Sequence, residues 1–563
     1  MAVPSQYPDI PIPPTDIWSF LFQRPDRPFL NSQVILADVY SGRSFTFHDL
    51  QRRSLHVGHI LRRRFGWHKG DVLSLVCGNS IDTPAIIWGV LAIGGIASPL
   101  NPNLPADQLA FYLQDSGAKA VVTQKAQYPA VLQACQKVGL ATDRIIVIDD
   151  PTQASLFQCA ASALPDAAAV AAHRPPVEDP QKEVAVLVYS SGTTGLPKGV
   201  MLSHTNIVIN LLQLAAVDDG YLTHRDSALA FLPFFHIYGV TCLINSGLYL
   251  GLTTYVMPRF ELETACRAIQ DHRITYVYTV PPVILQFVQN PLVEQFDLSS
   301  LRLFNSAAAP LSVELIQALW EKRRIIVRQQ YGMSECSPCL HSQVFHLSPL
   351  PIYFTLPYDS DHQTWQEGRD HPGSVGRLVA NMQAKYVPIP GEEVRSDGKK
   401  EGELWVKGPN VFLGYLNNPQ ATHDSFSEDG YYKTGDVGYE DHRGSFVVTD
   451  RIKELIKYNG FQVAPAELEN ILLGHPAVAD VAVVGIPSGQ AGSELPRAYV
   501  QVAGPGLDTP TTAAGLVAFV KRRAGASYKE LRGGVLFVDA IPRNPAGKIL
   551  RRELKKKYAV SKM

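Results

Sequence analysis

The feature that most constrains this chain is a short strand that runs straight into a glycine- and hydroxyl-rich loop. Residues 184–189 (VAVLVY) form a β-branched run that predicts a buried strand. The backbone N–H groups and hydroxyls of the loop after it can surround phosphate oxygens, and Lys198 adds a mobile positive charge. The loop consists of Ser190, Ser191, Gly192, Thr193, Thr194, Gly195, Leu196, Pro197 and Lys198, and helical character begins at His204.

The loop differs from the Walker A loop of P-loop nucleotidases. Pro197 stands directly before the lysine, where the Walker A pattern has glycine, and Gly199 follows where that pattern has serine or threonine. Taken alone, the loop is also compatible with a glycine- and threonine-rich turn that binds nothing. The phosphate hypothesis therefore depends on the motifs further along the chain.

Strand-type and helical segments alternate through most of the chain, which predicts an α/β fold. A second apolar run, residues 274–280, predicts a buried strand that stops at two prolines. Past Asp450 charged residues become denser, and two further strands are expected before a basic helical segment closes the chain. We therefore expect two domains, residues 1–449 and residues 450–563.

Charge, cysteines and hydropathy exclude several classes of function. Lys and Arg number 51 against 52 for Asp and Glu, so the chain has no overall bias toward nucleic acid or acidic membranes. Seven scattered cysteines do not make a disulfide framework and favour a reducing compartment. Residues 85–100 are too short to span a membrane, and residues 239–257 carry Asn245 and Ser246, which favours a buried helix running into a buried strand. We expect no transmembrane span and no nucleic-acid partner.

The last three residues resemble a sorting signal. Ser561-Lys562-Met563 differs by one residue from the Ser-Lys-Leu tripeptide that peroxisomal import receptors bind, and it follows a basic stretch. The tripeptide predicts a peroxisomal protein with an import receptor as partner. The alternative is a frayed basic tail on a cytoplasmic protein.

Four further motifs follow the phosphate-type loop: QYGMSE at residues 330–335, YKTGD at 432–436, DRIKELIK at 450–457 and PRNPAGK at 542–548. With YSSGTTGLPKGVMLSH, the ordered set resembles the adenylate-forming superfamily of acyl-CoA and aryl-CoA ligases, firefly-type luciferases and peptide-synthetase adenylation domains. PFFHIYG and KELIKYNGFQVAPAELE are similar to the 4-coumarate–CoA ligase branch. The resemblance covers nearly the whole chain.

The resemblance implies a fold and a set of substrates. The fold is α/β, with a large N-terminal domain of layered sheets that includes a small β-barrel-like subdomain, and a small mobile α+β C-terminal domain. ATP, Mg²⁺, coenzyme A and a small carboxylic acid are the expected ligands. The acid is joined to AMP with release of pyrophosphate, and the CoA thiol then displaces AMP to give acyl-CoA.

The resemblance also assigns the ATP site. The loop from Ser190 to Lys198 would hold the departing phosphates, while Glu335 offers a hard oxygen ligand to Mg²⁺ and Ser334 a hydroxyl to the α-phosphate. Asp436 and Arg451 would bind the ribose, unless they only form an ion pair with each other. The small-residue turn along the adenine and the residues beside it are Ala307, Ala308, Ala309, Gln330, Tyr331 and Gly332.

Lys548 matches the lysine that crosses the cleft during adenylation in this superfamily. Its charge would stabilise the transition state at the α-phosphate. The second half-reaction then requires rotation of the small domain about Asp450. That rotation would bring Lys457, Gly460 and Gln462 to the acyl-adenylate and the pantetheine tunnel, although Asn459 stands where plant ligases of this branch usually have a second lysine.

The resemblance also assigns residues to an acyl pocket. His236 would orient the carboxylate or gate the thiol route, with a core histidine as the alternative. Glycine is usual in the hydroxycinnamate ligases where this chain has Ala308 and Gln330, so an aryl-alkanoic, phenylpropanoid-like or medium-chain acid is expected. The Cys336–Cys339 pair lacks further metal ligands and predicts packing. The full pocket set is His236, Tyr238, Cys242, Ala308, Gln330, Gly332, Pro338 and Cys339.

Three other functions share parts of this pattern. An enzyme that adenylates an acid for a carrier protein has the same first half-reaction, and a luciferase-like monooxygenase has the same fold. A degenerate nucleotide-binding module is the third. Intact Glu335, Asp436, Arg451 and Lys548 argue against degeneration, and the absence of a carrier domain from this sequence favours CoA ligation.

Overall fold

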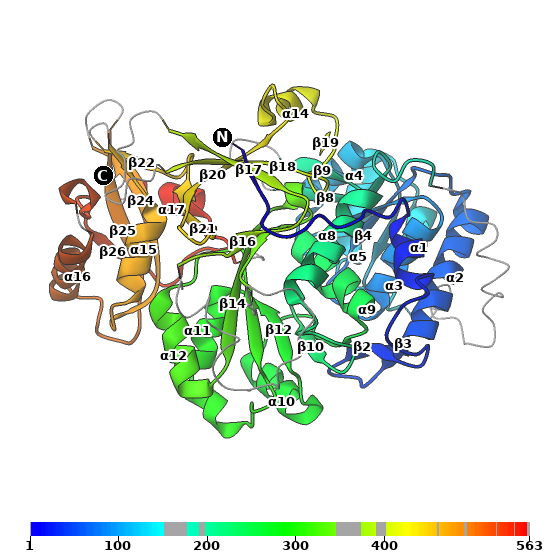
Figure 1. Ribbon diagram of the computed structural model, residues 1–563, viewed down its shortest axis with the longest axis horizontal. Coiled ribbons are helices and arrows are strands. Elements are labelled where there is room, and N and C mark those ends of the chain that lie inside the picture. The colour runs from blue at the N-terminus through cyan, green and yellow to red at the C-terminus, as the bar shows by residue number, and fades with distance from the viewer. Residues whose placement is uncertain are drawn as a thin grey trace.

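The structure is a computed structural model that describes residues 2–150, 177–190, 197–344, 373–389, 401–458, 461–488, 493–524, 526–544 and 547–559. Two large mixed sheets, mainly parallel, form most of the molecule (Figure 1). In spatial order, the nine-stranded sheet contains β16 (Arg377–Leu378), β15 (Cys339–Ser342), β14 (Ile326–Gly332), β13 (Leu303–Ser306), β12 (Tyr276–Thr279), β10 (Ser227–Ala230), β11 (Thr253–Val256), β2 (Val34–Asp38) and β3 (Ser44–Thr46).

The seven-stranded sheet contains the two residues, Ser190 and Lys198, at the ends of the predicted phosphate loop. Its strands in spatial order are β19 (Gly414–Tyr415), β9 (Lys198–Ser203), β8 (Val184–Ser190), β5 (Ile96–Leu100), β4 (Val72–Val76), β6 (Ala118–Thr123) and β7 (Ile145–Val147). The predicted strand at residues 184–189 is therefore confirmed as β8. It is followed by the antiparallel strand β9 before the chain turns helical at His204, so the loop joins two strands of a hairpin.

Helices cover both sheets, and two hydrophobic clusters join the helices to the strands. Proline starts α11 at Pro281, because its missing N–H costs nothing in the first helical turn, and β12 ends just before it, as expected. The α-helices of this large unit are α1 (Ile17–Phe22), α2 (Phe47–Phe65), α3 (Asp82–Ala92), α4 (Ala106–Ser116), α5 (Tyr128–Val138), α8 (His204–Asp218), α9 (Ser246–Leu250), α10 (Leu262–His272), α11 (Pro281–Gln289), α12 (Val313–Arg323) and α14 (Pro419–Ser425).

The apolar stretch at residues 239–257 is a buried helix followed by a buried strand, as predicted. A π-helical segment, Gly239–Asn245, continues into α9 and then into β11. Within the described ranges, no helix has both the length and the apolar character needed to cross a membrane.

The large unit also contains a five-stranded antiparallel sheet, whose last strand in the chain precedes the small unit. The sheet consists of β1 (Val3–Pro4), β17 (Gln383–Pro388), β18 (Gly402–Lys407), β20 (Tyr432–Glu440) and β21 (Phe446–Arg451). Strands β20 and β21 pair Asp436 with Arg451, which places two predicted ribose residues side by side. This sheet is the small antiparallel part of the large unit, for which the resemblance implies a β-barrel-like subdomain without giving its residues.

The elements after β21 form a smaller α+β unit at one end of the long axis, opposite α1 and α2 (Figure 1). It has its own hydrophobic core, built from residues between Ile456 and Leu531. The two-part α/β architecture is confirmed, while the boundary at Asp450 stays a prediction. The elements are β22 (Ile456–Tyr458), β23 (Phe461–Val463), α15 (Pro465–Leu473), β24 (Val478–Pro487), β25 (Glu494–Val502), α16 (Pro510–Arg523), β26 (Val535–Phe537) and α17 (Arg551–Ala559).

A buried ion pair ties α8 to the nine-stranded sheet. Asp218, the last residue of α8, pairs with Arg328 of β14, and each side chain is 2% exposed. Arg328 also donates to Asn305 Oδ1 at 2.7 Å and to the Tyr276 hydroxyl at 2.9 Å. A guanidinium that is removed from water depends on such partners, so this pair is a point where the large unit is sensitive to substitution.

We expect Asp218→Ala to destabilise the large unit by about 3–5 kcal/mol, because the buried guanidinium loses its anionic partner. Urea denaturation followed by intrinsic fluorescence measures this loss. The control is Glu263→Ala, which breaks an ion pair with Arg267 whose side chains are 58% and 59% exposed; it should change stability by less than ~1 kcal/mol. Equal effects of the two substitutions would contradict the prediction.

Candidate active site

The two ends of the predicted phosphate loop lie directly opposite each other. Ser190 ends β8 and Lys198 begins β9, and the two are register partners in the antiparallel pair. The intervening candidates, Ser191 to Gly195, lie outside the described residues. The hairpin therefore delivers a hydroxyl and an ammonium group to the same end of the seven-stranded sheet.

Glu335 lies in a 3₁₀ turn, Ser334–Cys336, that follows β14. Its side chain is mostly buried, and Oε1 accepts a hydrogen bond from the Tyr415 hydroxyl at 3.0 Å. Within the described ranges, no cluster of three or more His, Cys, Asp or Glu side chains could enclose a metal ion. One carboxylate suits Mg²⁺, which usually takes one or two protein oxygens and completes its shell with water and substrate phosphates.

Gly332 is required by a close backbone approach between β14 and β15. A Cβ atom built on it would lie 1.9 Å from the carbonyl oxygen of Pro338. The adjacent Met333 N–H donates to that same carbonyl at 2.9 Å. Any side chain at residue 332 would therefore push apart the segment that carries Ser334 and Glu335.

The predicted ribose residues form an ion pair in this structure. Arg451 Nε lies 2.6 Å from Asp436 Oδ1, and the Tyr331 hydroxyl donates to Oδ2 of the same carboxylate at 2.6 Å. Asp436 raises the pKa of Arg451, opposing burial, so the guanidinium stays charged. The ion pair proposed as the alternative to ribose binding is thus present, and it leaves further lone pairs of the carboxylate for donors from a ligand.

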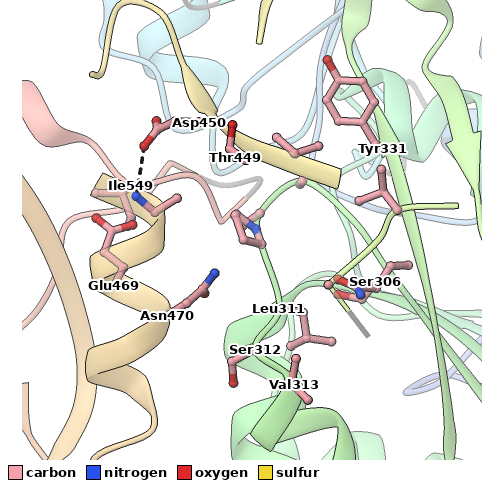
Figure 2. A pocket seen from close by; sticks show the side chains of 18 of the residues that line it. Ser306, Leu311, Ser312, Val313, Tyr331, Thr449, Asp450, Glu469, Asn470 and Ile549 are labelled. Atoms are coloured by element: carbon pink, nitrogen blue, oxygen red, sulfur yellow. Dashed lines mark hydrogen bonds between the residues drawn. The ribbon is translucent and has the colours of Figure 1, made fainter. Parts of the chain in front are cut away.

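A cavity of about 480 Å³ opens beside this pair and runs between the two units. Figure 2 shows Glu469 and Asn470 on α15 facing Leu311, Ser312 and Val313 across the open space. Further predicted ATP-site residues line the same cavity: Ala308, Ala309, Gln330, Tyr331, Gly332, Asp436, Arg451 and Lys548. Ala307 precedes this turn and is half-buried.

Ala308 adopts a left-handed backbone conformation, with φ at 72°. A residue with a Cβ atom costs about 1–2 kcal/mol in that region, where glycine is comfortable. The strain lies at the tip of the turn that the resemblance assigns to adenine. The chain therefore keeps a methyl group at the mouth of the cavity at some cost in stability.

Lys548 reaches the cavity from the small unit. Its Nζ lies 3.9 Å from Glu454 Oε1, and its backbone is fixed by Asn544, whose Oδ1 accepts from the Lys548 N–H at 2.9 Å. Burial lowers the pKa of Lys548, and the Arg451 charge lowers it further, while Glu454 and Asp436 oppose the shift. The lysine therefore faces the same carboxylate and guanidinium that the ribose is expected to meet.

Lys457 and Gln462 lie elsewhere in the small unit. They are register partners in the β22–β23 hairpin, and Lys457 is exposed. Neither is among the described residues that line the cavity. Asn459 and Gly460 lie outside the described residues, as does the Ser561–Met563 tripeptide, so the import signal stays a prediction.

Of the predicted acyl-pocket residues, Ala308, Gln330 and Gly332 line the 480 Å³ cavity. The other members of the set do not line it: His236 is half-buried, and the remainder, Tyr238, Cys242, Pro338 and Cys339, are buried. Burial raises the pKa of the Cys336 thiol well above its usual range and that of Cys339 to about 12. These cysteines are neutral packing residues, as the sequence predicts.

Gln330 is fixed at both ends of its amide group. Asn305 Nδ2 donates to Gln330 Oε1 at 2.6 Å, and Gln330 Nε2 donates to Ser342 Oγ at 3.1 Å. Tyr238 joins the same network by donating its hydroxyl to the Asn305 carbonyl at 3.1 Å. The amide of Gln330 therefore has protein partners for both its oxygen and its nitrogen while the residue lines the cavity.

His236 is neutral at physiological pH. Burial lowers its pKa to about 4, and Nδ1 accepts a hydrogen bond from the Tyr238 N–H at 3.2 Å. Because one ring nitrogen is an acceptor, the neutral ring must carry its proton on Nε2. His236 can therefore donate to a carboxylate oxygen, which agrees with an orienting role better than with removal of a thiol proton.

Comparisons with known proteins agree with this arrangement. The family model of the AMP-binding enzyme matches residues 20–416, and that of the AMP-binding enzyme C-terminal domain matches residues 467–548. The chain belongs to the AMP-binding enzyme family. This confirms the resemblance to adenylate-forming enzymes.

Three similar proteins each match this chain along almost its whole length. The probable 4-coumarate–CoA ligase 1 of Dictyostelium discoideum is 35% identical, covering 98% of this chain and 97% of the relative. ATP-bound MatB from Rhodopseudomonas palustris is 25% identical with a TM-score of 0.77, covering 97% of this chain and 99% of that one. The o-succinylbenzoate CoA synthetase MenE from Bacillus subtilis, solved with its acyl-adenylate intermediate, is 26% identical with a TM-score of 0.73, covering 96% and 98%.

Sequence reasoning missed Tyr415, Glu454 and Asn305. Tyr415 contacts Glu335, Glu454 contacts Lys548, and Asn305 holds Gln330. A signal existed for Glu454, which lies within the DRIKELIK motif. Tyr415 and Asn305 reach their partners only through the tertiary fold, so the sequence offered no local signal for either.

The carboxyl group of Asp450 lies where the chain passes between the two units. It accepts hydrogen bonds from its neighbour, the Arg451 N–H, at 2.6 Å and from the Ala466 N–H at 3.1 Å. Burial raises its pKa to about 7, despite the opposing Arg551 charge. The unfolded chain would release this proton near pH 4, so folding loses stability as pH rises from about 4 to about 7.

We expect Asp450→Asn to remove that loss. Asparagine cannot ionise, so the stability of the variant relative to the parent should rise by about 2–3 kcal/mol between pH 5 and pH 8, which is the larger part of the loss that the parent suffers as pH rises from about 4 to about 7. The hydrogen bond that asparagine loses gives an offset that does not vary with pH. Calorimetric unfolding of both proteins across this range checks the prediction, and a constant difference would contradict it.

Proposed function

We propose that this AMP-forming acid–thiol ligase activates an aryl-alkanoic, phenylpropanoid-like or medium-chain acid, and that its small unit rotates about Asp450 between the two half-reactions. The observation that carries the proposal is the position of Lys548. It extends from the small unit into a cavity that is also lined by Asp436, Arg451 and Tyr331 of the large unit. Names of the relatives, such as 4-coumarate–CoA ligase, support the acid class.

In the first half-reaction an acid carboxylate oxygen attacks the α-phosphorus of ATP. The new O–P bond forms as the bond to the β-phosphate breaks, and pyrophosphate leaves with the electron pair. Lys548 places a positive charge where negative charge gathers in the transition state. Asp436 binds the ribose hydroxyls, and Arg451 holds Asp436 in place.

The phosphate end of ATP lies toward the β8–β9 hairpin in this scheme. Lys198 attracts the departing phosphates, and the Glu335 carboxylate supplies an oxygen to the cation. Mg²⁺, when bound, neutralises charge on the phosphates. His236 donates a hydrogen bond from its Nε2–H to the acid carboxylate and keeps it oriented for attack.

In the second half-reaction the CoA sulfur attacks the acyl carbon of the acyl-adenylate. The C–S bond forms, the bond to AMP breaks, and the thiol proton leaves to solvent. Lys548 has to withdraw so that the thiol can approach the same place. Rotation about Asp450 would bring Lys457 and Gln462 to this position together, because they lie opposite each other on one hairpin.

A panel of acids tests the proposed function. With ATP and Mg²⁺, the parent protein should release pyrophosphate for aryl-alkanoic, phenylpropanoid-like or medium-chain acids, and it should form a thioester only when CoA is added. The ratio kcat/KM for each acid is measured by pyrophosphate release, and the thioester by mass spectrometry. Pyrophosphate exchange that is indifferent to CoA, with no thioester from any acid, would instead favour loading of a carrier protein.

Lys548→Ala separates the two half-reactions. Removing the charge should lower the rate of adenylate formation by about 10²- to 10³-fold, in line with other donors to a developing oxyanion. Conversion of a supplied acyl-adenylate and CoA to thioester should stay near the parent rate. Single-turnover assays of each step measure both.

The control for this substitution is Lys556→Ala, on the exposed face of α17. It removes a lysine of the same unit without contacting the cavity and should leave both steps unchanged. Equal loss of both half-reactions in Lys548→Ala would show that the two-conformation scheme assigns the lysine wrongly.

A further inference from the structure

A short segment of the large unit connects the two groups that are expected at the phosphate end of ATP. Residues 412–416 lie along β9, where Gly414 pairs with Met201 and Tyr415 with Val200. The Leu416 N–H also donates to the Gly199 carbonyl at 2.7 Å. The segment is therefore bonded to the strand that begins with Lys198.

The same segment fixes Glu335. The Phe412 N–H donates to the backbone carbonyl of Glu335 at 2.8 Å, and the Tyr415 hydroxyl donates to its carboxylate Oε1 at 3.0 Å. Both the main chain and the carboxylate of Glu335 are thus held by residues of one short segment. The side chain of Phe412 packs edge-on against Tyr415, with ring centroids 4.9 Å apart, which restricts the tyrosine ring.

The ring of Tyr415 also contacts Lys198. The lysine Nζ lies 4.7 Å from the ring centroid, within range of a cation–π interaction. Burial raises the pKa of the Tyr415 hydroxyl, and the Glu335 charge adds to the shift, so the group remains a proton donor. One side chain, 8% exposed, therefore meets a carboxylate at its hydroxyl and an ammonium on its face.

Glu335 and Lys198 therefore both contact Tyr415 without forming an ion pair with each other. In the part of the chain that the structure describes, no ion pair connects Lys198 with Glu335. An ion pair between Lys198 and Glu335 would neutralise the lysine charge that the departing phosphates need. It would also occupy the carboxylate oxygens that the cation needs. A hydroxyl donor and an aromatic face stabilise each charge while leaving it available.

We propose that Tyr415 is a positioning residue that holds Glu335 and Lys198 apart and oriented for the cation and the departing pyrophosphate. The proposal rests on the function proposed above, since it assigns the phosphate end of ATP to these two groups. Tyr415 touches neither the acid nor the nucleoside part of ATP in this scheme. It acts through the two side chains that do the binding.

The experiment compares nucleotide binding in Tyr415→Phe and the parent protein, without any acid present. Isothermal titration calorimetry is run with ATP and Mg²⁺, with ATP and EDTA, and with AMP. Loss of a hydrogen bond to a metal-binding carboxylate typically weakens metal affinity by about 10- to 100-fold. We expect the Mg²⁺ concentration that half-saturates ATP binding to rise about tenfold, while AMP binding is unchanged because AMP lacks the β and γ phosphates.

Two further variants sharpen the result. Tyr415→Leu also removes the aromatic face, which lets Lys198 pair with Glu335, so ATP binding should weaken in EDTA as well. The matched control is Tyr431→Phe, which deletes another buried hydroxyl, bonded to Gln383 at 2.9 Å, from a ring that also lies near a lysine, Lys385. It should leave all three titrations at the parent values.

The outcomes separate this proposal from the proposed function. A magnesium dependence in Tyr415→Phe equal to that of the parent overturns the positioning role, whatever the activity of the enzyme. An equal loss of AMP affinity shows a general structural defect and overturns it too. If the parent binds ATP and AMP but forms no thioester from any acid, the ligase proposal fails while the binding comparison still stands.

Discussion

The ion pair between Asp436 and Arg451 is the constraint on which the cleft depends. The two residues are partners on neighbouring strands, and the carboxylate is 2% exposed, so neither can move without the other. Tyr331 reaches the same carboxylate from the nine-stranded sheet, and Lys548 approaches it from the small unit. Residues of the five-stranded sheet, the nine-stranded sheet and the small unit therefore all lie around one buried carboxylate. Within the large unit, the two direct contacts of Asp436, with Arg451 and with Tyr331, join the five-stranded sheet to the nine-stranded sheet beside the cavity.

A second buried pair supports the neighbouring acyl region. Asp218 and Arg328 connect α8 with β14, and the guanidinium continues through Asn305 to Gln330. The Gln330 side chain, which lines the cavity, is thus held by hydrogen bonds that lead back to a buried ion pair in the large unit.

Local patterns in the sequence predicted much of the fold, because they report short-range preferences. The runs that became β8, β12 and β24 are apolar and β-branched, and the prolines at the start of α11 mark its first turn. The ordered motifs also predicted that Asp436, Arg451 and Lys548 share one cleft, and the structure places them on one cavity. The roles of these residues in catalysis stay predictions. The sequence did not predict the antiparallel β8–β9 hairpin around the phosphate-type loop, because the residues of β9 are equally compatible with a segment that precedes a helix.

Contacts between distant residues could not be predicted in the same way. Tyr415 and Glu335 are 80 positions apart, and Asp218 and Arg328 are 110 apart. A tyrosine or an arginine in an apolar stretch shows that a partner is needed but does not identify it. Likewise, Gln330 was predicted to line the pocket, but its amide partners, Asn305 and Ser342, could not be predicted from the sequence.

The β22–β23 hairpin has one more consequence. Opposite residues of an antiparallel pair share a face, so Lys457 and Gln462 can be presented only together. The hairpin packs into the core of the same unit that carries the turn of Lys548. In the proposed rotation, a motion that brings the pair inward would also take Lys548 out of the cavity, because both belong to one unit. Phosphoryl chemistry and thiol chemistry would then occur one after the other, with different groups facing the half-activated acid in each step.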